Sequence, residues 1–452
     1  MQAASPSTRG SPDSQSPPGG VELREDVPLT PSGSGGGARL CAGGPRFIVA
    51  SFAALTAATT LALLTQIYYG DYEVVPHGSV SSDAKSCSGA GTETLKAGGR
   101  SMDAAVAAAL CLAAVAPHRT SLDASGTLLY WEYREWRRSA AWLAEWGGTG
   151  VRRGAAPRLL VALAALHAQY GRLPWSQLLQ PAVDLASIRR DYSMLALPHR
   201  RGPDASVGVG AARGGGPGAP ARALLADYLE SLQHNTSAEL SSAWSSESDL
   251  RVSSPAAVRA GGWRVWVGGA GAGTVARALV AGLSPPPADV DDATRRVVAA
   301  LQQEAASDAL SPGGVSSGLA VVDAQDTYLA LVTGLSVPFG SGPVTSSGWS
   351  QDSPTAPLDL TPAILVDQFV CGTRYVLGGS SAAAVAQAAA ALAVTGVPSA
   401  VERGRASDTT PASASDPAPA SDPAPAVNVV QQRGDALASH ADSRGGGLAS
   451  RF

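Results

Sequence analysis

The sequence is poor in charged residues, aromatic residues and cysteine. Only 15% of its 452 residues are charged and the formal net charge is −4, so electrostatics give no case for a nucleic-acid partner. The four cysteines are too few for a disulfide framework and lie at no metal-ligand spacing. Glycine (51) and proline (32) are abundant instead, which predicts that part of the chain is disordered.

Both ends of the chain have low complexity. Residues 1–46 are rich in Ser, Pro and Gly and contain almost no branched or aromatic residues, while residues 401–452 contain the run ASDPAPASDPAPA. Such segments bury too little apolar surface to offset the entropy of folding. We therefore expect both tails to be disordered.

An uncharged apolar run, Phe47–Tyr69, follows the first tail. As a helix it spans about 34 Å, enough for a bilayer core of about 30 Å. A buried core helix is the alternative. Arginines precede the run and acidic residues follow it, so the positive-inside rule predicts a single-pass type II membrane protein. The first tail would lie in the cytosol, and everything after the helix would lie outside the cell or in a lumen.

The segment between residues 312 and 342 contains a candidate catalytic nucleophile. Two apolar runs, Leu319–Asp323 and Tyr328–Thr333, flank a polar turn, which predicts a β-hairpin with the hydroxyl pair Ser316 and Ser317 at its head. If the peptide bond before Ser316 cleaved itself, the freed α-amine, with a pKa of about 7.7–8.0, would serve as a base for the adjacent hydroxyl. An ordinary surface hairpin is the alternative.

Local patterns predict further elements around this hairpin. Capping residues, prolines and glycines at the ends of apolar runs indicate helices, and a run of β-branched and aromatic residues indicates a strand. The expected helices are Gly98–Pro117, Pro157–Tyr170, Trp175–Ser187, Val298–Ala305 and Ala382–Thr395, and the expected strand is Thr127–Tyr133.

Several of these segments resemble the γ-glutamyltransferases, also called glutathione hydrolases. Asp83–His118 is similar to the N-terminal helix region of that family, and Pro157–Ala186 contains GRLPW followed by QPA. SSGLAVVDA, from Ser316, stands where the family has Thr-x-His-x-Ser-Val-Val-Asp, and Pro338–Gly342 (PFGSG) matches a family loop. The divergent gamma-glutamyltransferase 6 branch is the most similar.

The resemblance implies an α+β fold of the N-terminal-nucleophile hydrolase type, an αββα sandwich, here preceded by a transmembrane helix. A precursor would cut itself into a large-subunit-like region, 77–315, and a small-subunit-like region, 316–400, which would form a heterodimer. The product would cleave γ-glutamyl amides of glutathione or its conjugates. It would transfer the γ-glutamyl group to water, an amino acid or a peptide, without a metal or organic cofactor.

The resemblance also assigns site residues. Ser316 stands at the position of the nucleophilic threonine, and Gly318 replaces a histidine. Arg134 matches the arginine of an Asp-x-Arg-Glu motif and would clamp the substrate α-carboxylate, unless it is a surface arginine. Ser336 replaces an asparagine that contacts the substrate amine, and Asp352 is the acid nearest to the family's amine-binding aspartate.

Other family positions have changed as well. The two glycines that donate backbone N–H groups to the oxyanion correspond to Ser381 and Ala382, Gly334 stands at a supporting threonine, and the glycine-rich loop corresponds to residues 121–126. With so many changes, a weak or inactive homologue that acts as a membrane-anchored binding or scaffold protein is the alternative function.

Two further assignments concern the compartment. Cys87 and Cys111 match family cysteine positions and would pair outside the cytosol, or else remain two buried thiols. Asn235 begins the sequon Asn-Thr-Ser, a glycosylation acceptor on the lumenal side.

Overall fold

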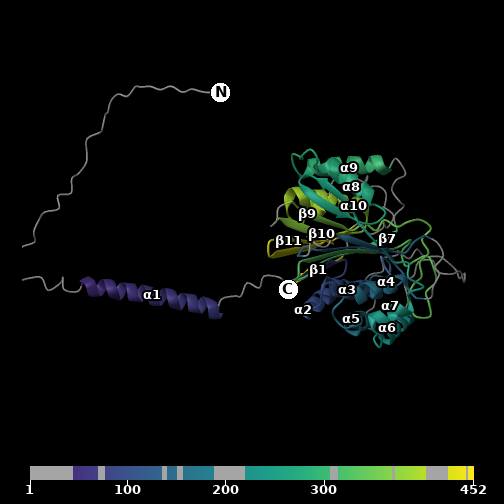
Figure 1. The fold of residues 1–452 in the computed structure, drawn as a ribbon, viewed down its shortest axis with the longest axis horizontal. Coiled ribbons are helices and arrows are strands. Elements are labelled where there is room, and N and C mark those ends of the chain that lie inside the picture. The colour runs from purple at the N-terminus through teal and green to yellow at the C-terminus, as the bar shows by residue number, and fades with distance from the viewer. Residues whose placement is uncertain are drawn as a thin grey trace, which may run out of the picture. The chain divides into compact units, whose positions relative to one another are not determined.

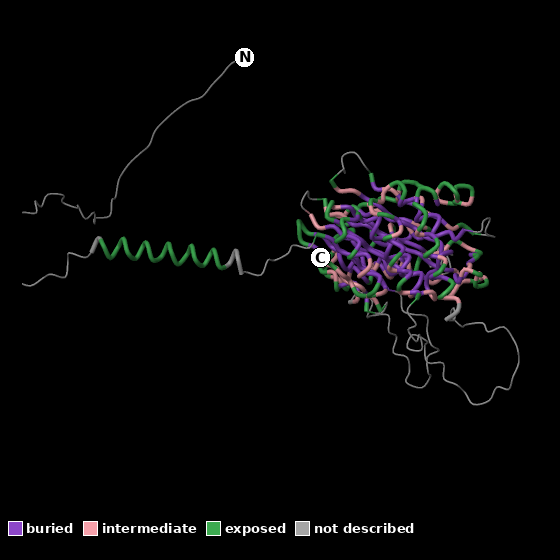
Figure 2. Tube along the Cα trace, turned by 90° about the horizontal axis from the view of Figure 1, so that it is seen from below, coloured by how far each residue is buried: buried purple, intermediate pink, exposed green. Residues whose placement is uncertain are grey.

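The computed structural model describes residues 44–69, 77–134, 140–149, 156–187, 219–305, 314–368, 372–403, 426–443 and 446–452. The chain divides into two units, residues 1–73 and 74–452. In the first unit, α1 (Gly44–Tyr69) is one helix whose window Arg46–Thr65 has a mean hydropathy of 2.1 and is 0% buried. Its length and composition would let it cross a membrane, and its described side chains are exposed (Figure 2). Of the tail expected to be disordered, residues 1–46, positions 1–43 lie outside the described residues and positions 44–46 belong to α1.

The second unit is built on two antiparallel sheets. In the described part of the chain, one has seven strands in the order β13-β1-β7-β8-β2-β3-β4, and the other has six in the order β12-β11-β10-β9-β6-β5. The strands of the first sheet are β1 (Ser79–Ser82), β2 (Ser125–Glu132), β3 (Trp142–Trp146), β4 (Arg251–Ser253), β7 (Val315–Val322), β8 (Thr327–Leu335) and β13 (Ser450–Arg451). Those of the second are β5 (Ala256–Ala260), β6 (Trp263–Val267), β9 (Ala363–Asp367), β10 (Thr373–Gly379), β11 (Val427–Arg433) and β12 (Ala436–Ala441).

Helices cover the outer face of each sheet, which makes four layers (Figure 1). Beside the first sheet lie α2 (Lys85–Lys96), α3 (Ser101–Val115), α4 (Arg158–Tyr170), α5 (Trp175–Ser187), α6 (Ala219–Leu232) and α7 (Ser237–Ala243). Beside the second lie α8 (Ala272–Leu283), α9 (Val290–Ala305) and α10 (Ala382–Thr395), and α11 (Ala400–Arg403) packs against α10. The arrangement is the αββα sandwich that the sequence led us to expect.

The strand β7 shows why these residues form a buried central strand. Successive side chains on a strand point to opposite faces. Leu319 and Val321 therefore join the core under the helices, while Ala320 and Val322 join the core between the sheets. A strand buried on both faces reads as a continuous apolar run, which is the pattern that identified the hairpin.

The helices expected from the sequence occur with small shifts at their ends. Helix α3 begins at Ser101, which is its first helical residue rather than its cap, and the Asp103 carboxylate accepts a hydrogen bond from the Arg100 N–H at 2.8 Å. Helix α9 extends eight residues before the expected Val298. Shifts of one or two residues are of the size that fraying and capping produce at helix ends, whereas the first eight residues of α9 are a part of the helix that the sequence patterns did not predict.

The C-terminal tail requires a correction. Residues 401–452 were expected to be disordered, yet β11, β12 and β13 lie within them. Strand β11 lies between β10 and β12 with its first six residues buried, and β13 pairs with β1. The proline-rich run at 411–425 lies outside the described residues. Its composition is typical of disorder, and the prediction made from it was wrongly extended to the residues that follow it.

Candidate functional site

Ser316 is the second residue of β7 and lies at one end of the first sheet. It pairs with Gly334 of β8, which in turn pairs with Ser125 of β2, so the three residues form one row across the sheet. By the alternation of β7, Ser316 faces the second sheet. It is 6% exposed, and its hydroxyl donates a hydrogen bond to the carbonyl of Ser380 at 3.0 Å.

The two sheets come unusually close beside Ser316. A Cβ atom at Gly318 would lie 2.2 Å from the carbonyl oxygen of Gly378, and one at Gly378 would lie 2.5 Å from the nitrogen of Leu319. The atoms in contact on both strands are backbone atoms, so no side chain could move aside to make room for a larger residue. Gly318, where the resemblance places a histidine, therefore has a structural reason to be glycine in this chain.

The loop after β10 brings Ser381 and Ala382 to the same end. Ser381 is the N-cap of α10, and its hydroxyl accepts from the N–H of Ala384 at 3.2 Å. The N–H of Ala382 is occupied, because it donates to the carboxylate of Asp359 at 2.8 Å. Burial raises the pKa of Asp359, against the lowering effect of this N–H and of the Thr361 hydroxyl. A backbone donor suited to an oxyanion is thus held by a carboxylate of the chain itself.

Ser336 and Asp352 also lie near this end, and they bind each other. The N–H of Ser336 donates to Asp352 at 2.7 Å, and its hydroxyl donates to the other oxygen of the same carboxylate. The N–H and hydroxyl of Ser341 add bonds of 3.1 and 3.0 Å, and Asp352 is 1% exposed. The carboxylate that would bind a substrate amine is therefore fully engaged within the loop.

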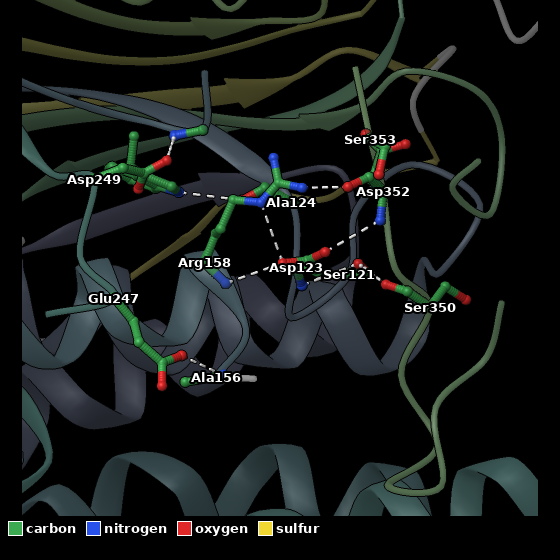
Figure 3. Close-up of polar contacts among 12 residues, drawn as sticks. Ser121, Asp123, Ala124, Ala156, Arg158, Glu247, Asp249, Ser350, Asp352 and Ser353 are labelled. Atoms are coloured by element: carbon green, nitrogen blue, oxygen red, sulfur yellow. Dashed lines mark hydrogen bonds and ion pairs between the residues drawn. The ribbon is translucent and has the colours of Figure 1, made fainter. Parts of the chain in front are cut away.

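A buried ion pair supports this loop from below (Figure 3). Asp123 accepts from the N–H of Arg158 at 3.2 Å, from its Nε at 3.3 Å and from the N–H of Asp352 at 3.1 Å. The guanidinium also donates to the Asp352 carbonyl. A hollow lined in part by Ser121 and Ser350, but by neither member of the pair, measures only about 10 Å³, room for about one water.

Arg134 does not lie at this end of the molecule. It follows β2 beyond Glu132, whereas Ser125 at the start of β2 belongs to the row of Ser316. Seven residues of strand separate the two ends, about 24 Å. Arg134 instead bonds Asp326 in the β7–β8 turn at 2.8 Å, with its side chain 63% exposed. The structure therefore does not support Arg134 as the clamp for a substrate bound at Ser316.

A second buried network lies beside Ser316 and joins β7 to β11 of the second sheet. The Ser317 hydroxyl donates to Asp83 at 2.8 Å, Arg119 pairs with the same carboxylate at 3.2 Å, and the amide of Asn428 donates to it at 2.6 Å. Asn428 also donates to the carbonyl of Gly318 at 2.9 Å. These contacts fix the start of β7 to β11 and to the loop before α2.

Sequence reasoning missed the acids that shape the site: Asp83, Asp123 and Asp359. Each lies in a loop, and its partners are remote in the sequence, so no periodic pattern marks it. The available signal at Asp359 was a single acid between Leu358 and Leu360, since a lone charge in an apolar run is either exposed or paired.

The remaining predicted residues belong to none of these networks. Cys87 and Cys111 are joined as a disulfide between α2 and α3, with an S–S distance of 2.05 Å. Asn235 is exposed just before α7. Among the described residues, no group of three or more His, Cys, Asp or Glu is arranged to hold a metal ion.

Comparison with solved structures defines the class of fold. A cephalosporin acylase from Bacillus halodurans superposes with a TM-score of 0.52 over 83% of this chain and 96% of that one, at 14% sequence identity. At that identity the likeness concerns the fold alone. The chain has the N-terminal-nucleophile hydrolase fold, as the resemblance implied.

Sequence comparison then identifies the family that the chain is related to. Residues 87–188 match the family model Gamma-glutamyltranspeptidase. "Glutathione hydrolase 7" of Mus musculus is 41% identical over 150 residues, 30% of this chain, and "Glutathione hydrolase 6" of Rattus norvegicus is 43% identical over 115 residues, 25% of this chain. The chain is thus a relative of the γ-glutamyltransferases, which confirms the resemblance. The alignments span only 23% and 22% of the two relatives' own lengths.

Proposed function

We propose that this chain is a membrane-anchored γ-glutamyltransferase or glutathione hydrolase with Ser316 as its nucleophile. Substrates would be glutathione, its conjugates or related γ-glutamyl compounds, and acceptors would be water, an amino acid or a peptide. The observation that carries the proposal is the place of Ser316. A hydroxyl stands at the head of a central strand, facing the space between the two sheets of an N-terminal-nucleophile hydrolase fold.

Maturation would begin with attack of the Ser316 Oγ on the Val315 carbonyl carbon. The peptide C–N bond breaks as an ester forms, and water hydrolyses the ester to leave the Val315 carboxylate and a free α-amine on Ser316. This step would divide the precursor into residues 1–315, which include the large-subunit-like region 77–315, and residues 316–452. The small-subunit-like region would include β11–β13 and would therefore extend past residue 400, where the sequence comparison with the family led us to end it.

The free α-amine would then act as general base for catalysis. It takes the proton from the Ser316 hydroxyl as Oγ bonds to the γ-glutamyl carbonyl carbon, and returns it to the leaving amine as the C–N bond breaks. Water or an acceptor amine resolves the acyl-enzyme. The N–H of Ala382 would have to exchange Asp359 for the oxyanion at this stage.

The maturation state tests the proposal most directly. We would express the full chain in a secretory system and analyse it on a denaturing gel, with sequencing of any new N-terminus. Wild type should yield a fragment that begins at Ser316, Ser316→Ala should stay whole, and the exposed-serine control Ser346→Ala should mature normally. Hydrolysis of a γ-glutamyl anilide should follow the same order. Equal hydrolysis by wild type and Ser316→Ala would remove Ser316 from the mechanism.

A second candidate function is a membrane-anchored binding or scaffold protein without catalysis. The specific observation in its favour is that Asp359 holds the Ala382 N–H while Arg134 lies at the far end of β2. In that case the chain stays whole in both wild type and Ser316→Ala, and neither hydrolyses the anilide.

We further propose a type II topology with the globular unit outside the cytosol. The apolar helix α1, the disulfide and the exposed Asn235 agree with this compartment. A glycosidase-sensitive mass that disappears in Asn235→Gln would support it. Extraction of the full chain by alkaline carbonate, without detergent, would contradict an integral anchor.

A further inference from the structure

A cavity of about 180 Å³ lies where α8 and α10 end and where the chain turns from β5 into β6. It opens to solvent beside Val394, which is 37% exposed. The rest of its lining is apolar and includes Trp263, Leu283, Pro286, Pro287 and Ala393. A cavity of about 150 Å³ in another protein holds a benzene-sized molecule, so this one has room for a small organic group.

Helices α8 and α10 direct their C-terminal ends towards this cavity. Their first turns are neighbours, because a Cβ built at Gly271, the N-cap of α8, would lie 2.5 Å from the Cβ of Ala382, the first residue of α10. Their last turns are also neighbours, since Leu283 and Val394 line the same cavity. The helices are therefore parallel, and the negative ends of both helix dipoles meet at the cavity. Neither last turn contains a basic residue that would offset them.

The last carbonyl groups of α8 lack the donors that usually follow a helix end. The N–H of Ser284 still donates back into the helix, but residues 285–287 are prolines and have no N–H. Among the described residues, no hydrogen bond to the carbonyls of residues 281–283 is found. The Leu283 carbonyl borders the cavity, because a Cβ at the cavity residue Gly261 would lie 2.8 Å from its oxygen.

The end of α10 has the same property. The N–H of Val397, which could have reached the Ala393 carbonyl, donates instead to the Thr395 hydroxyl at 3.3 Å. The residue that would donate to the Val394 carbonyl is Pro398, which has no N–H. Within the part of the chain that the structure describes, neither carbonyl has a donor. Unpaired carbonyl dipoles of two helices thus adjoin one cavity.

The cavity also contains an aromatic ring. Trp263 is the first residue of β6 and is half-buried, and its ring contacts Tyr375 with a centroid distance of 5.6 Å. The described arginines that lie over aromatic rings lie over other residues. The face of an indole attracts a cation that comes within about 6 Å of the ring centroid. The ring and the carbonyls therefore favour the same sign of charge.

We propose that this cavity binds a small quaternary ammonium ion. The unpaired carbonyls, the two helix dipoles and the indole all attract a positive charge. The lining has no charged side chain, and the indole N–H is its one polar side-chain group, so a primary ammonium would lose water without gaining enough partners. A quaternary ammonium spreads its charge over methyl groups and has no N–H to satisfy, so it suits an apolar lining.

The loop beside the cavity already accepts a cation at one carbonyl. The guanidinium of Arg296 in α9 donates to the carbonyl of Pro285 at 2.9 Å, and it also pairs with Asp292. Because that pair is neutral overall, it adds no net repulsion to a cation in the cavity.

The cavity is remote from Ser316. The carbonyl of Ser380 accepts the Ser316 hydroxyl, and the next residue, Ser381, is the N-cap of α10. The 14 residues of α10 span about 21 Å, so the cavity at its other end lies about 20 Å from Ser316. The proposal therefore goes beyond the γ-glutamyltransferase function and does not depend on it.

Binding is tested on the full chain in a maltoside detergent, which carries no ammonium group. Saturation-transfer NMR would follow the methyl protons of choline and of 3,3-dimethylbutan-1-ol, which has the same shape without the charge. Choline should bind saturably at millimolar concentration. The uncharged alcohol, and ethanolamine as the primary ammonium, should each bind at least about tenfold more weakly.

Two variants locate the site. Val394→Lys would place its own ammonium at the cavity and should weaken choline binding at least about tenfold, and the exposure of this residue lets the chain fold. The matched control Leu224→Lys adds the same charge at a 44% exposed helical position on the first sheet's side and should bind choline as wild type does. Trp263→Leu should weaken binding while it keeps the lining apolar.

The proposal is overturned if choline does not bind, if the uncharged alcohol binds as tightly, or if Val394→Lys leaves choline binding unchanged. Tighter binding of an acetylated Ala-Pro-Ala-Pro peptide than of choline would also overturn it, because the cavity would then suit a proline-rich chain. Ser316→Ala should bind choline as wild type does. Choline binding without cleavage or anilide hydrolysis would sustain the cavity while the proposed catalysis failed, and catalysis without choline binding would do the reverse.

Discussion

The close approach of the sheets at Gly318 gives a prediction whose size can be worked out. The family residue at this position is a histidine, so a simple reading would restore activity by Gly318→His. A Cβ at Gly318 would lie 2.2 Å from the Gly378 oxygen, whereas such contacts are essentially never shorter than 3.0 Å. β7 and β10 would have to separate by at least about 0.8 Å, against a core that packs as densely as a crystal.

Overpacking of this kind costs about 1–3 kcal/mol, and we expect the upper end for Gly318→Ala because backbone cannot rotate away. The entropy of unfolding is about 2.1 cal/mol/K per residue, so about 380 residues lose about 4 °C in melting temperature for 3 kcal/mol. Gly318→His should be worse, and it should not raise hydrolysis of a γ-glutamyl anilide.

The matched control is Gly89→Ala in α2, where a Cβ would meet nothing within 4 Å. Alanine in a helix interior should raise stability by about 0.5–1 kcal/mol. Thermal unfolding of the full chain in detergent compares the two variants. If Gly318→Ala melts at or above the temperature of Gly89→Ala, the argument from the distance between sheets is refuted.

Three further predictions follow from other contacts. Replacing Cys87 and Cys111 by serine should lower stability by about 2–4 kcal/mol, because the disulfide closes a loop of 24 residues, and reducing agent should then have no further effect. Arg134→Ala should change stability by less than about 1 kcal/mol and leave anilide hydrolysis unchanged, since its exposed bond to Asp326 is remote from Ser316. Burial, with a smaller effect of Arg119, lowers the pKa of His118 to about 4, so the folded state disfavours the imidazolium. The resulting stability is complete above about pH 6.5 and is lost as the pH falls towards 4, and His118→Gln should flatten that decline by about 1–2 kcal/mol.

Each of these has an outcome that contradicts it. Unchanged melting of the double serine variant would mean that the disulfide does not form in the folded chain. A large loss of hydrolysis in Arg134→Ala would return that residue to the site. Parallel melting curves against pH for wild type and His118→Gln would show that the imidazole does not change its pKa on folding.

Local sequence patterns predicted the elements on which the site is built. The hairpin β7–β8 was recognisable because both strands are continuous apolar runs around a polar turn, and α10 because its residues are an alanine-rich run. Short strands that have no clear alternation, or that adjoin a segment of different composition, were not predicted. Strand β11 has only seven residues and follows a proline-rich run, and β9 is a short apolar stretch with no alternation.

The polar contacts of the site were beyond local reasoning. Asp123 and Arg158 are 35 residues apart, and Asp359 and Ala382 are 23 apart, so only the packed fold shows which acid meets which donor. Arg134 lies far from Ser316 because of the direction of β2. A residue that follows a strand lies at the opposite end of that strand from the residue that begins it. Linear distance from a motif therefore gave no information about distance from Ser316.

The strand order has a consequence for any cleaved form of the chain. β7 and β8 lie between β1 and β2, and β13 flanks β1 on its other side. If the chain were cleaved before Ser316, strands of the N-terminal and C-terminal pieces would therefore be interleaved in one sheet. In the second sheet β9 likewise pairs with β6 across the same boundary. The halves could not part without dissolving both sheets, and a nicked molecule would migrate as an intact one until a denaturant separated its pieces.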